Sequence, residues 1–490
     1  MSSPARGAPL EKGLRVGALG FASSLVIAVA STAPGYSVAA SLGVVAASVA
    51  TQSPAVLWLA FLPMLCIASS YYALNRVDPD CGTTFTWVTR SMGPWTGWIA
   101  GWALLVADLL VMASLAQIAG KYSFRLLGLD EAARSTFWVT SVGVVWIVAM
   151  TWICYVGIEA SARTQWFLLA AEVFVLALFA AVALARVYAG HFANSVEPSL
   201  RWLNPFELPA SALNTGVLTA VFIYWGWDTA LAVNEETERA EHTPGQAALV
   251  STVLLLGIYV VVAVAAQAVH GPQFLVDNKE DVLSALGGQV LPFGLDKLLI
   301  VAVLTSASAA TQTTILPATR SMLAMAAHGA APRSMGAISP RYLTPGVSTL
   351  WMGGVSIAWC LALSALSQHV LDDAVTATGL AISFYLAITG LACTIYFRKA
   401  LFNDPRTFLL AGLGPSAGCA ALGYVFVRSC IDLADPGGSG SGEAWLGVGA
   451  PLAIAILSLV TGVVLMGLWW RADPTFFQRR TEAADPATRL

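Results

Sequence analysis

Long apolar runs alternate with short polar segments along most of the chain. Each run of about twenty apolar residues is long enough to cross a hydrocarbon core roughly 30 Å thick as a helix. A transmembrane β-barrel would instead have segments of about ten residues with alternating polarity. The pattern predicts an all-α polytopic membrane protein with about twelve spans, near residues 17–46, 53–74, 94–120, 136–156, 164–187, 211–234, 246–269, 295–326, 347–367, 372–397, 408–430 and 446–470.

Composition agrees with lipid as the main solvent of the chain. Of the 490 residues, 57% are apolar and 11% are charged, against roughly a quarter charged in an ordinary soluble domain. A net charge of −3 gives no basic surface for nucleic acid. The seven cysteines lack the spacing of a metal site, so we expect no metal ion. We also expect no cofactor. No obligatory protein partner is inferred from the sequence.

Basic residues set the expected orientation. With the N-terminus in the cytoplasm, seventeen of the 25 lysines and arginines fall in cytoplasmic segments, which predicts a cell-membrane protein (inner or plasma membrane) with both termini inside. The first apolar run lacks a cleavage site and is expected to stay as a span. We divide the chain into a cytoplasmic tail (1–13), a helical core (14–400), helices 11 and 12 (401–472) and a second cytoplasmic tail (473–490).

Two predicted spans contain residues that interrupt helices. Span 1 carries Pro34 and Gly35 near its middle, and span 6 carries Gly226 between two tryptophans. Backbone groups freed at mid-depth need protein or a water-filled cavity around them, and they can then bind a ligand. Breaks five spans apart predict an inverted repeat, with helices 1–5 (about 14–190) and 6–10 (about 205–400) as its halves. The alternative is that both are ordinary kinks.

Three carboxylates lie inside predicted spans, namely Asp108, Glu172 and Asp228. Each costs roughly 2.5–3.5 kcal/mol at mid-depth on insertion scales, and no basic side chain is expected at the same depth. Their charge must therefore be neutralised by a proton, a metal cation or a substrate ammonium. We predict that these residues serve proton coupling. The alternative, which applies best to Asp108, is a protonated carboxyl bonded to a backbone carbonyl.

Several motifs appear in an order that resembles a known family. The segment Arg320–Pro332 is similar to R-x-L-x-A-M-A-R-D-G-x-x-P, with His328 in place of the aspartate. Residues 235–244 are similar to E-E-T-x-x-P-x-x-x-x-P, with Ala240 in place of the first proline, and Cys81–Trp102 is similar to the entry into span 3. The chain is thus similar to the amino acid–polyamine–organocation permeases. That resemblance implies the LeuT-like five-plus-five fold, first seen in sodium-coupled leucine transporters.

The resemblance also implies a substrate site between the two breaks. Freed N–H groups near Ala33, Gly35 and Tyr36 would hold a substrate carboxylate. Carbonyl groups of the two breaks would hold the amine, with the substrate-binding residues Ser31, Phe222, Trp225 and Gly226. Span 1 departs from the family, because Thr-Ala-Pro-Gly-Tyr replaces the usual G-S/T-G. Glu172 falls where some proton-coupled relatives carry a lysine.

These features predict a secondary active transporter that moves a small amino acid by alternating access, coupled to protons. A polyamine or organic-amine carrier and an amino acid exchanger are the alternatives. A membrane enzyme is disfavoured, because no nucleophile–base pair or metal cluster is visible in the sequence. A channel or receptor is disfavoured because the loops are short.

Overall fold

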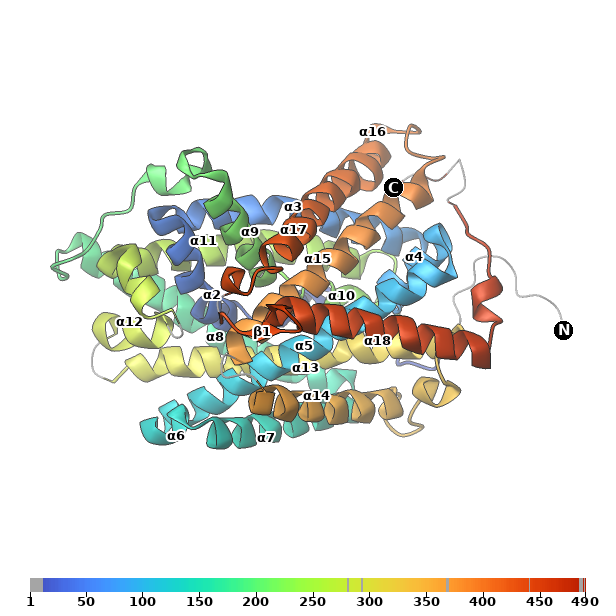
Figure 1. The fold of residues 1–490 in the computed structure, drawn as a ribbon, viewed down its shortest axis with the longest axis horizontal. Coiled ribbons are helices and arrows are strands. Elements are labelled where there is room, and N and C mark those ends of the chain that lie inside the picture. The colour runs from blue at the N-terminus through green and yellow to red at the C-terminus, as the bar shows by residue number, and fades with distance from the viewer. Residues whose placement is uncertain are drawn as a thin grey trace.

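The computed structural model describes residues 12–279, 282–291, 294–366, 370–439, 441–483, 488 and 490. Long helices dominate it, as continuous apolar runs dictate (Figure 1). The helices of the first half are α1 (Phe21–Ser31), α2 (Pro34–Val49), α3 (Ser53–Val77), α4 (Thr84–Met92), α5 (Pro94–Leu126), α6 (Asp130–Arg134), α7 (Thr136–Val156) and α8 (Ile158–Tyr188).

The second half repeats the alternation of long and short helices. Its helices are α9 (Ala210–Ile223), α10 (Thr229–Ala232), α11 (Thr243–Asp277), α12 (Val282–Val290), α13 (Asp296–Ala327), α14 (Gly346–Leu366) and α15 (Val370–Phe397). The last part contains α16 (Pro405–Thr407), the π-helical turn η6 (Phe408–Leu413), α17 (Gly414–Asp432) and α18 (Ala450–Ala472). The strands β1 (Ala444–Trp445) and β2 (Val448–Gly449) form an antiparallel pair between α17 and α18, in the register Ala444↔Gly449 and Trp445↔Val448. Short 3-10 turns fill the remaining connections: η1 (Ala50–Gln52), η2 (Leu200–Leu203), η3 (Pro205–Glu207), η4 (Asn234–Glu236), η5 (Arg333–Gly336), η7 (Pro436–Gly438) and η8 (Phe476–Gln478).

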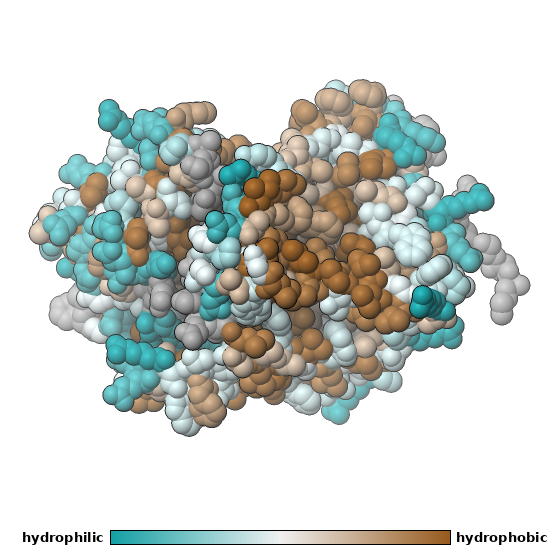
Figure 2. All heavy atoms as spheres, in the orientation of Figure 1, coloured by the Kyte–Doolittle hydropathy of each residue, from teal (hydrophilic) through white to brown (hydrophobic). Residues whose placement is uncertain are grey.

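Ten helical stretches within the described residues are long and apolar enough to cross a membrane. One of them, Phe21–Val77, contains the first two predicted spans, whereas the broken sixth span is not among the ten. The number of spans, twelve, therefore stays a prediction. Figure 2 shows hydrophobic side chains gathered across the middle of one face and more hydrophilic ones toward its two ends. Half-exposed Leu457, Val460 and Val464 of α18 belong to the apolar surface, which fits contact with lipid.

The two broken helices lie inside the bundle. α1 packs against α8, α10, α11 and α13, and α2 packs against α9, α11 and α13. α5 lies beside both α13 and α15 (Figure 1). Each break is thus surrounded by protein, which is the condition for irregular backbone at membrane depth.

The described segment before α1 and the segment after α18 lie at one end of the bundle, since Lys12 and His328 both contact Asp80, and Arg479 contacts His328. The Leu19 N–H donates to the Glu236 carbonyl, and the Glu238 N–H donates to the Leu19 carbonyl, at 3.0 and 2.8 Å. Near the other chain end, the Phe476 ring stacks on Phe85 with the centroids 5.6 Å apart. Of the predicted tail 1–13, residues 1–11 lie outside the described residues, as do 484–487 and 489 of the tail 473–490. We name the end of the bundle where Leu19 pairs with Glu236 and Glu238, and where Phe476 stacks on Phe85, the terminal end.

Candidate functional site

The first span is broken where the sequence predicted. α1 ends at Ser31 and α2 begins at Pro34, with Ala33 in the left-handed region at a φ of 48°. Proline suits the first helical position because it has no N–H to leave unpaired. The next N–H groups are bonded to side chains of other helices: that of Gly35 donates to Glu172 Oε1 at 2.6 Å and that of Tyr36 to Ser306 Oγ at 3.0 Å.

The second break contacts the first. α9 ends at Ile223 and α10 begins at Thr229, with Gly226 between them at a φ of 122°. A β-carbon on Gly226 would lie 2.5 Å from the carbonyl oxygen of Ser31, so only glycine lets the two breaks approach this closely. Nearby, the Ser31 and Thr229 hydroxyls form a 2.8 Å hydrogen bond.

A tyrosine of α11 connects both interruptions. The Tyr259 hydroxyl donates to the carbonyl of Ile223 at 2.7 Å and lies 3.4 Å from that of Thr32. These carbonyls belong to residues at the end of α9 and just after α1, where a helix leaves its last acceptors unpaired. One hydroxyl therefore links the two half-helix ends.

Glu172 lies on α8 against the start of α2, and its side chain is fully buried. Its Oε1 accepts the Gly35 N–H, and the Ser306 side chain lies beside it at Gly35. Its second oxygen, Oε2, has no hydrogen-bond partner among the described residues. A carboxylate is favoured at this place, because the N-terminus of a helix carries partial positive charge.

Asp228 belongs to a separate group around the second break. It accepts a hydrogen bond from the Tyr385 hydroxyl of α15 at 2.8 Å, and that hydroxyl accepts one from Trp225 Nε1–H at 2.5 Å. Asp108 of α5 is buried and close enough to Asp228 for their charges to interact, while its Oδ2 lacks a partner within the described chain. The structure thus gathers the three predicted acids into two places, one at each break.

In the described chain, no lysine, arginine or histidine forms an ion pair with Asp108, Glu172 or Asp228. A buried carboxylate without a fixed cation is costly unless hydrogen bonds or a mobile cation stabilise it.

Aromatic side chains line the region between the breaks. The rings of Tyr36 and Phe222 meet edge to face with centroids 6.4 Å apart, and the Tyr36 hydroxyl pairs with Ser114 at 2.8 Å. Phe222 and Trp225 are almost completely buried. The structure therefore brings Phe222 together with Tyr36, whereas the Trp225 indole is held by Tyr385.

Replacing Tyr385 by phenylalanine removes only the hydroxyl that joins Trp225 to Asp228. We expect initial uptake rates to fall by about ten- to a hundredfold, because a hydrogen bond to a charged group contributes roughly 1.5–3 kcal/mol. The measurement is uptake into liposomes by equal amounts of folded protein. Tyr424→Phe, on an exposed face of α17, is the control and should transport normally; a normal Tyr385→Phe variant would contradict the role of this hydroxyl.

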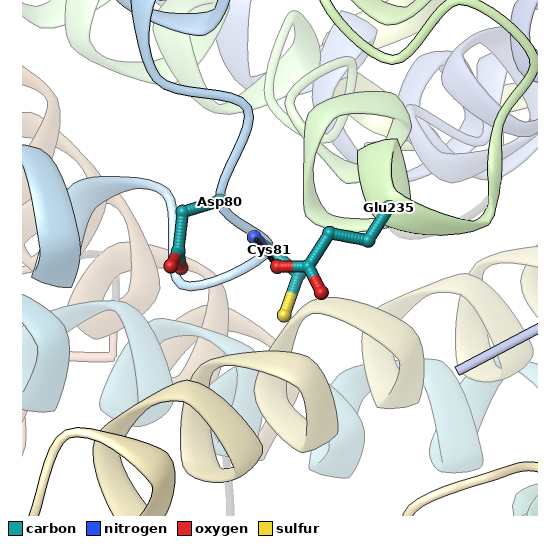
Figure 3. A group of neighbouring side chains, drawn as sticks. All are labelled: Asp80, Cys81 and Glu235. Carbon is teal, nitrogen blue, oxygen red and sulfur yellow. Dashed lines mark hydrogen bonds between the residues drawn. The ribbon is translucent and has the colours of Figure 1, made fainter. Parts of the chain in front are cut away.

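A second polar cluster lies at the terminal end. Asp80, Cys81 and Glu235 come within reach of one another, and the Cys81 N–H donates to Glu235 Oε1 at 2.9 Å (Figure 3). These ligand types could hold a metal ion. The Lys12 ammonium lies among them, 2.9 Å from Asp80 Oδ2, 2.5 Å from Glu235 Oε1 and 3.6 Å from Cys81 Sγ. The Lys12 ammonium therefore already occupies the position that a metal ion would take.

Lys12 and Asp80 favour each other's charged forms. Burial by itself would lower the pKa of Lys12, but the neighbouring acidic groups raise it above its ordinary value. Burial would raise the pKa of Asp80, whereas Lys12 and His328 bring it below its usual range. Next to it, Arg320 and Glu236 form a fully buried ion pair with a 2.9 Å contact.

Asp78, beside this cluster, gives a pH-dependent prediction. Burial raises its pKa to about 7, although Arg90 at 3.1 Å opposes the shift. Because the unfolded value is about 3.9, the folded state binds more protons between these values, and stability falls as pH rises from about 4 to 7. We expect Asp78→Asn to raise the melting temperature more at pH 8 than at pH 5. Asp432→Asn at an exposed ion pair is the control, and an equal gain at both pH values would contradict the prediction.

Several contact residues were not predicted from the sequence. Ser306, Tyr259 and Tyr385 come from helices far along the chain, and Lys12 lies in a predicted tail. A signal exists for Ser306, because it lies in a run of serine, alanine and threonine within an otherwise apolar span. A single tyrosine in an apolar helix gives no comparable signal.

Paired broken helices inside a bundle with many exposed apolar side chains are typical of a multi-pass membrane transporter. The fold is similar to that of MhsT, whose crystal structure in complex with L-phenylalanine matches with a TM-score of 0.60 at 13% identity, over 85% of this chain and 99% of that one. This match confirms the expected LeuT-like fold. Residues 19–436 match the family described as amino acid permease. The chain belongs to this family, as the motifs indicated, and is a transporter and not an enzyme.

Characterised and uncharacterised transporters are among its relatives. An uncharacterized transporter of Mycobacterium tuberculosis (strain ATCC 25618 / H37Rv) is 27% identical over 78% of this chain and 79% of the relative. The branched-chain amino acid permease BcaP of Bacillus subtilis (strain 168) is 24% identical over 75% and 78%. The low-affinity putrescine importer PlaP of Escherichia coli (strain K12) is 22% identical over 65% and 69%. The family and these relatives indicate an amino acid or an amine as the substrate.

Proposed function

We propose that the protein is a proton-coupled symporter that carries a small amino acid by alternating access across the cell membrane. The observation that carries the proposal is the contact of the two breaks, at Gly226 and Ser31, beside buried carboxylates without a fixed cation. Helix ends at a break offer N–H groups to a carboxylate and carbonyls to an ammonium. The family of the chain supports an amino acid as the ligand.

Proton coupling rests on Glu172 and Asp228. Both are buried within helices or at a helix break, and protonation is a way for such groups to lose their charge during the cycle. In the proposed cycle, substrate binds between the breaks, Phe222 and Trp225 close over it, and one of the acids changes protonation as the site changes sides. Asp108 is a third candidate for this role.

The test is uptake by the purified protein in liposomes with an inward proton gradient and no sodium. We expect saturable uptake of labelled L-alanine or L-leucine that collapses when a protonophore is added. Empty liposomes are the control. Uptake that needs sodium, or that ignores the protonophore, would contradict proton coupling, while saturable counterflow alone would favour an exchanger.

An organic amine is the second candidate substrate. The observation in its favour is the set of three buried carboxylates with no ion-pair partner in the described part of the chain. A relative named as a putrescine importer adds to it. Putrescine uptake in the same liposomes, without uptake of amino acids, would decide for this candidate.

We also propose that both termini face the cytoplasm. The excess of basic residues in the segments assigned to that side supports this orientation. The terminal end would then be the cytoplasmic end, and its ion pairs would close the inward path. Protease protection of tags on right-side-out and inverted vesicles tests the proposal, and a tag cleaved only from outside would reject it.

A further inference from the structure

We infer that Glu172 occupies the carboxylate position at the start of α2 in the empty transporter, so that it and a substrate carboxylate exclude each other. Binding of one amino acid then requires Glu172 to take up one proton. This inference rests on the proposed function, because it assumes a substrate with a carboxylate. It adds the physical reason why substrate and proton travel together.

The first step is a complete account of the N–H groups at this helix start. The Ala33 N–H donates to the Ala30 carbonyl at 3.1 Å, and Pro34 has no N–H. The N–H groups of Gly35 and Tyr36 donate to Glu172 and Ser306. No donor of the first turn of α2 is left for a ligand unless one of these contacts is released.

The second step is that the structure itself shows a carboxylate bound here. Glu172 Oε1 lies 2.6 Å from the Gly35 nitrogen, a short distance typical of a charge-assisted hydrogen bond. The Ser306 hydroxyl accepts the next N–H, that of Tyr36, and its side chain borders Gly35 beside the Glu172 carboxylate. The start of α2 therefore has the donors that an α-carboxylate needs.

The third step concerns the unpaired oxygen. Glu172 Oε2 is buried without a partner in the described residues. An orphaned carboxylate oxygen in a dry site is unfavourable, and it leaves Glu172 held by one side only. Such a side chain can be replaced at Gly35 by a ligand that satisfies both of its own oxygens.

The fourth step is the charge balance. Two ionised carboxylates cannot share one buried donor, so one must be protonated. The substrate carboxylate is the stronger acid in an amino acid zwitterion, which leaves Glu172 as the group that takes the proton from the water on the open side. Acceptors for the new O–H are close, because the Ala302 carbonyl and the Ser306 side chain both border Gly35. The proton leaves when the substrate leaves on the other side.

Few other titratable groups face Glu172. On α11, the titratable group that faces Glu172 is the Tyr259 hydroxyl. An ionised Tyr259 would interact with the charge of Glu172, but this hydroxyl is already hydrogen-bonded to the Ile223 carbonyl. α1 and α12 carry no titratable side chain, and Tyr36 of α2 is paired with Ser114. The ionisable groups of α13 are those at its ends, Asp296, Lys297 and Arg320, and Cys154 of α7 contacts the Gln312 carbonyl. Glu172 is therefore the group at this helix start whose protonation can respond to substrate.

The test measures binding of labelled L-leucine to the full-length protein in nanodiscs from pH 5.5 to 8. In the wild type, we expect affinity to fall by about tenfold per pH unit above the titration of Glu172, the slope for one linked proton. Glu172→Gln, which is neutral and nearly the same shape, should bind with an affinity that does not depend on pH. Glu172→Ala, which leaves the Gly35 N–H free, should do the same. Glu159→Gln, an exposed acid of the same helix, is the matched control and should keep the wild-type slope.

A second measurement uses only the wild type and so does not depend on whether the variants fold. A pH indicator in weak buffer should report uptake of about one proton per bound L-leucine. L-leucinamide, which lacks the carboxylate, should bind without that uptake.

The outcomes separate this inference from the proposed function. An unchanged pH slope in folded Glu172→Gln, or equal proton uptake with both ligands, overturns the competition while leaving amino acid transport intact. Binding of putrescine in place of any amino acid overturns the proposed function, and the competition with it.

Discussion

Gly226→Ala is expected to reduce uptake at least a hundredfold while the protein still inserts in the membrane. The added β-carbon would lie 2.5 Å from the carbonyl oxygen of Ser31, 2.6 Å from its carbon and 2.9 Å from the nitrogen of Thr32. All three are backbone atoms and cannot turn aside as a flexible side chain would. The φ of 122° is also unfavourable for alanine. Overpacking costs roughly 1–3 kcal/mol and a left-handed backbone about 1–2 more, so the breaks must separate.

The matched control is Gly257→Ala on α11. A β-carbon there meets no atom within 4 Å, and Gly257 is an exposed helical residue. Alanine in a helix should leave uptake unchanged or stabilise the protein slightly. Normal uptake by Gly226→Ala, at matched amounts of folded protein, would show that transport tolerates separation of the two breaks.

Glu236→Ala is expected to destabilise the protein by about 3–5 kcal/mol, because it leaves the Arg320 guanidinium buried and unpaired. Both side chains are fully buried, and Arg320 Nε and a terminal nitrogen each bond a carboxylate oxygen of Glu236, at 2.9 and 3.1 Å. Burial raises the pKa of Glu236 even beside Arg320. Thermal unfolding in detergent and the yield of monodisperse protein measure the effect.

A double variant distinguishes pairing from packing. Glu236→Met with Arg320→Met removes both charges and keeps much of the volume, so it should recover most of the stability that Glu236→Ala loses. Glu159→Ala is the control, because its partner Arg15 is half-exposed and such pairs contribute roughly 0–1 kcal/mol. A double variant no more stable than the single one would mean that the charges themselves are needed at this place.

The spans and breaks could be predicted because each leaves a local mark in the sequence. Apolar runs locate the membrane helices, and Pro34, Gly35 and Gly226 locate the interruptions to within a residue or two. Burial of Asp108, Glu172 and Asp228 was also predictable, since a charge amid apolar residues is rare enough to notice.

The partners of these residues could not be predicted, because they depend on which helices meet. Hydropathy gives the depth of Glu172 but not the direction in which it points, so its contact with Gly35 was not foreseen. The resemblance placed a substrate carboxylate at Gly35 and Tyr36, and the structure places Glu172 and Ser306 there. The binding measurements described above test whether the substrate displaces them.

In the proposed cycle, the ion pairs of Lys12 affect the relative populations of the two states in which the site is open to one side of the membrane or the other. Its ammonium joins a loop beyond α3 to the segment after α10, although it belongs to neither. Any motion that admits water at the terminal end must pull a charge from two carboxylates that are otherwise shielded. In the proposed cycle that work would be done once per turnover, and we expect it to favour a resting state that is open at the opposite end. A neutral residue at position 12 would shift that population without touching the substrate.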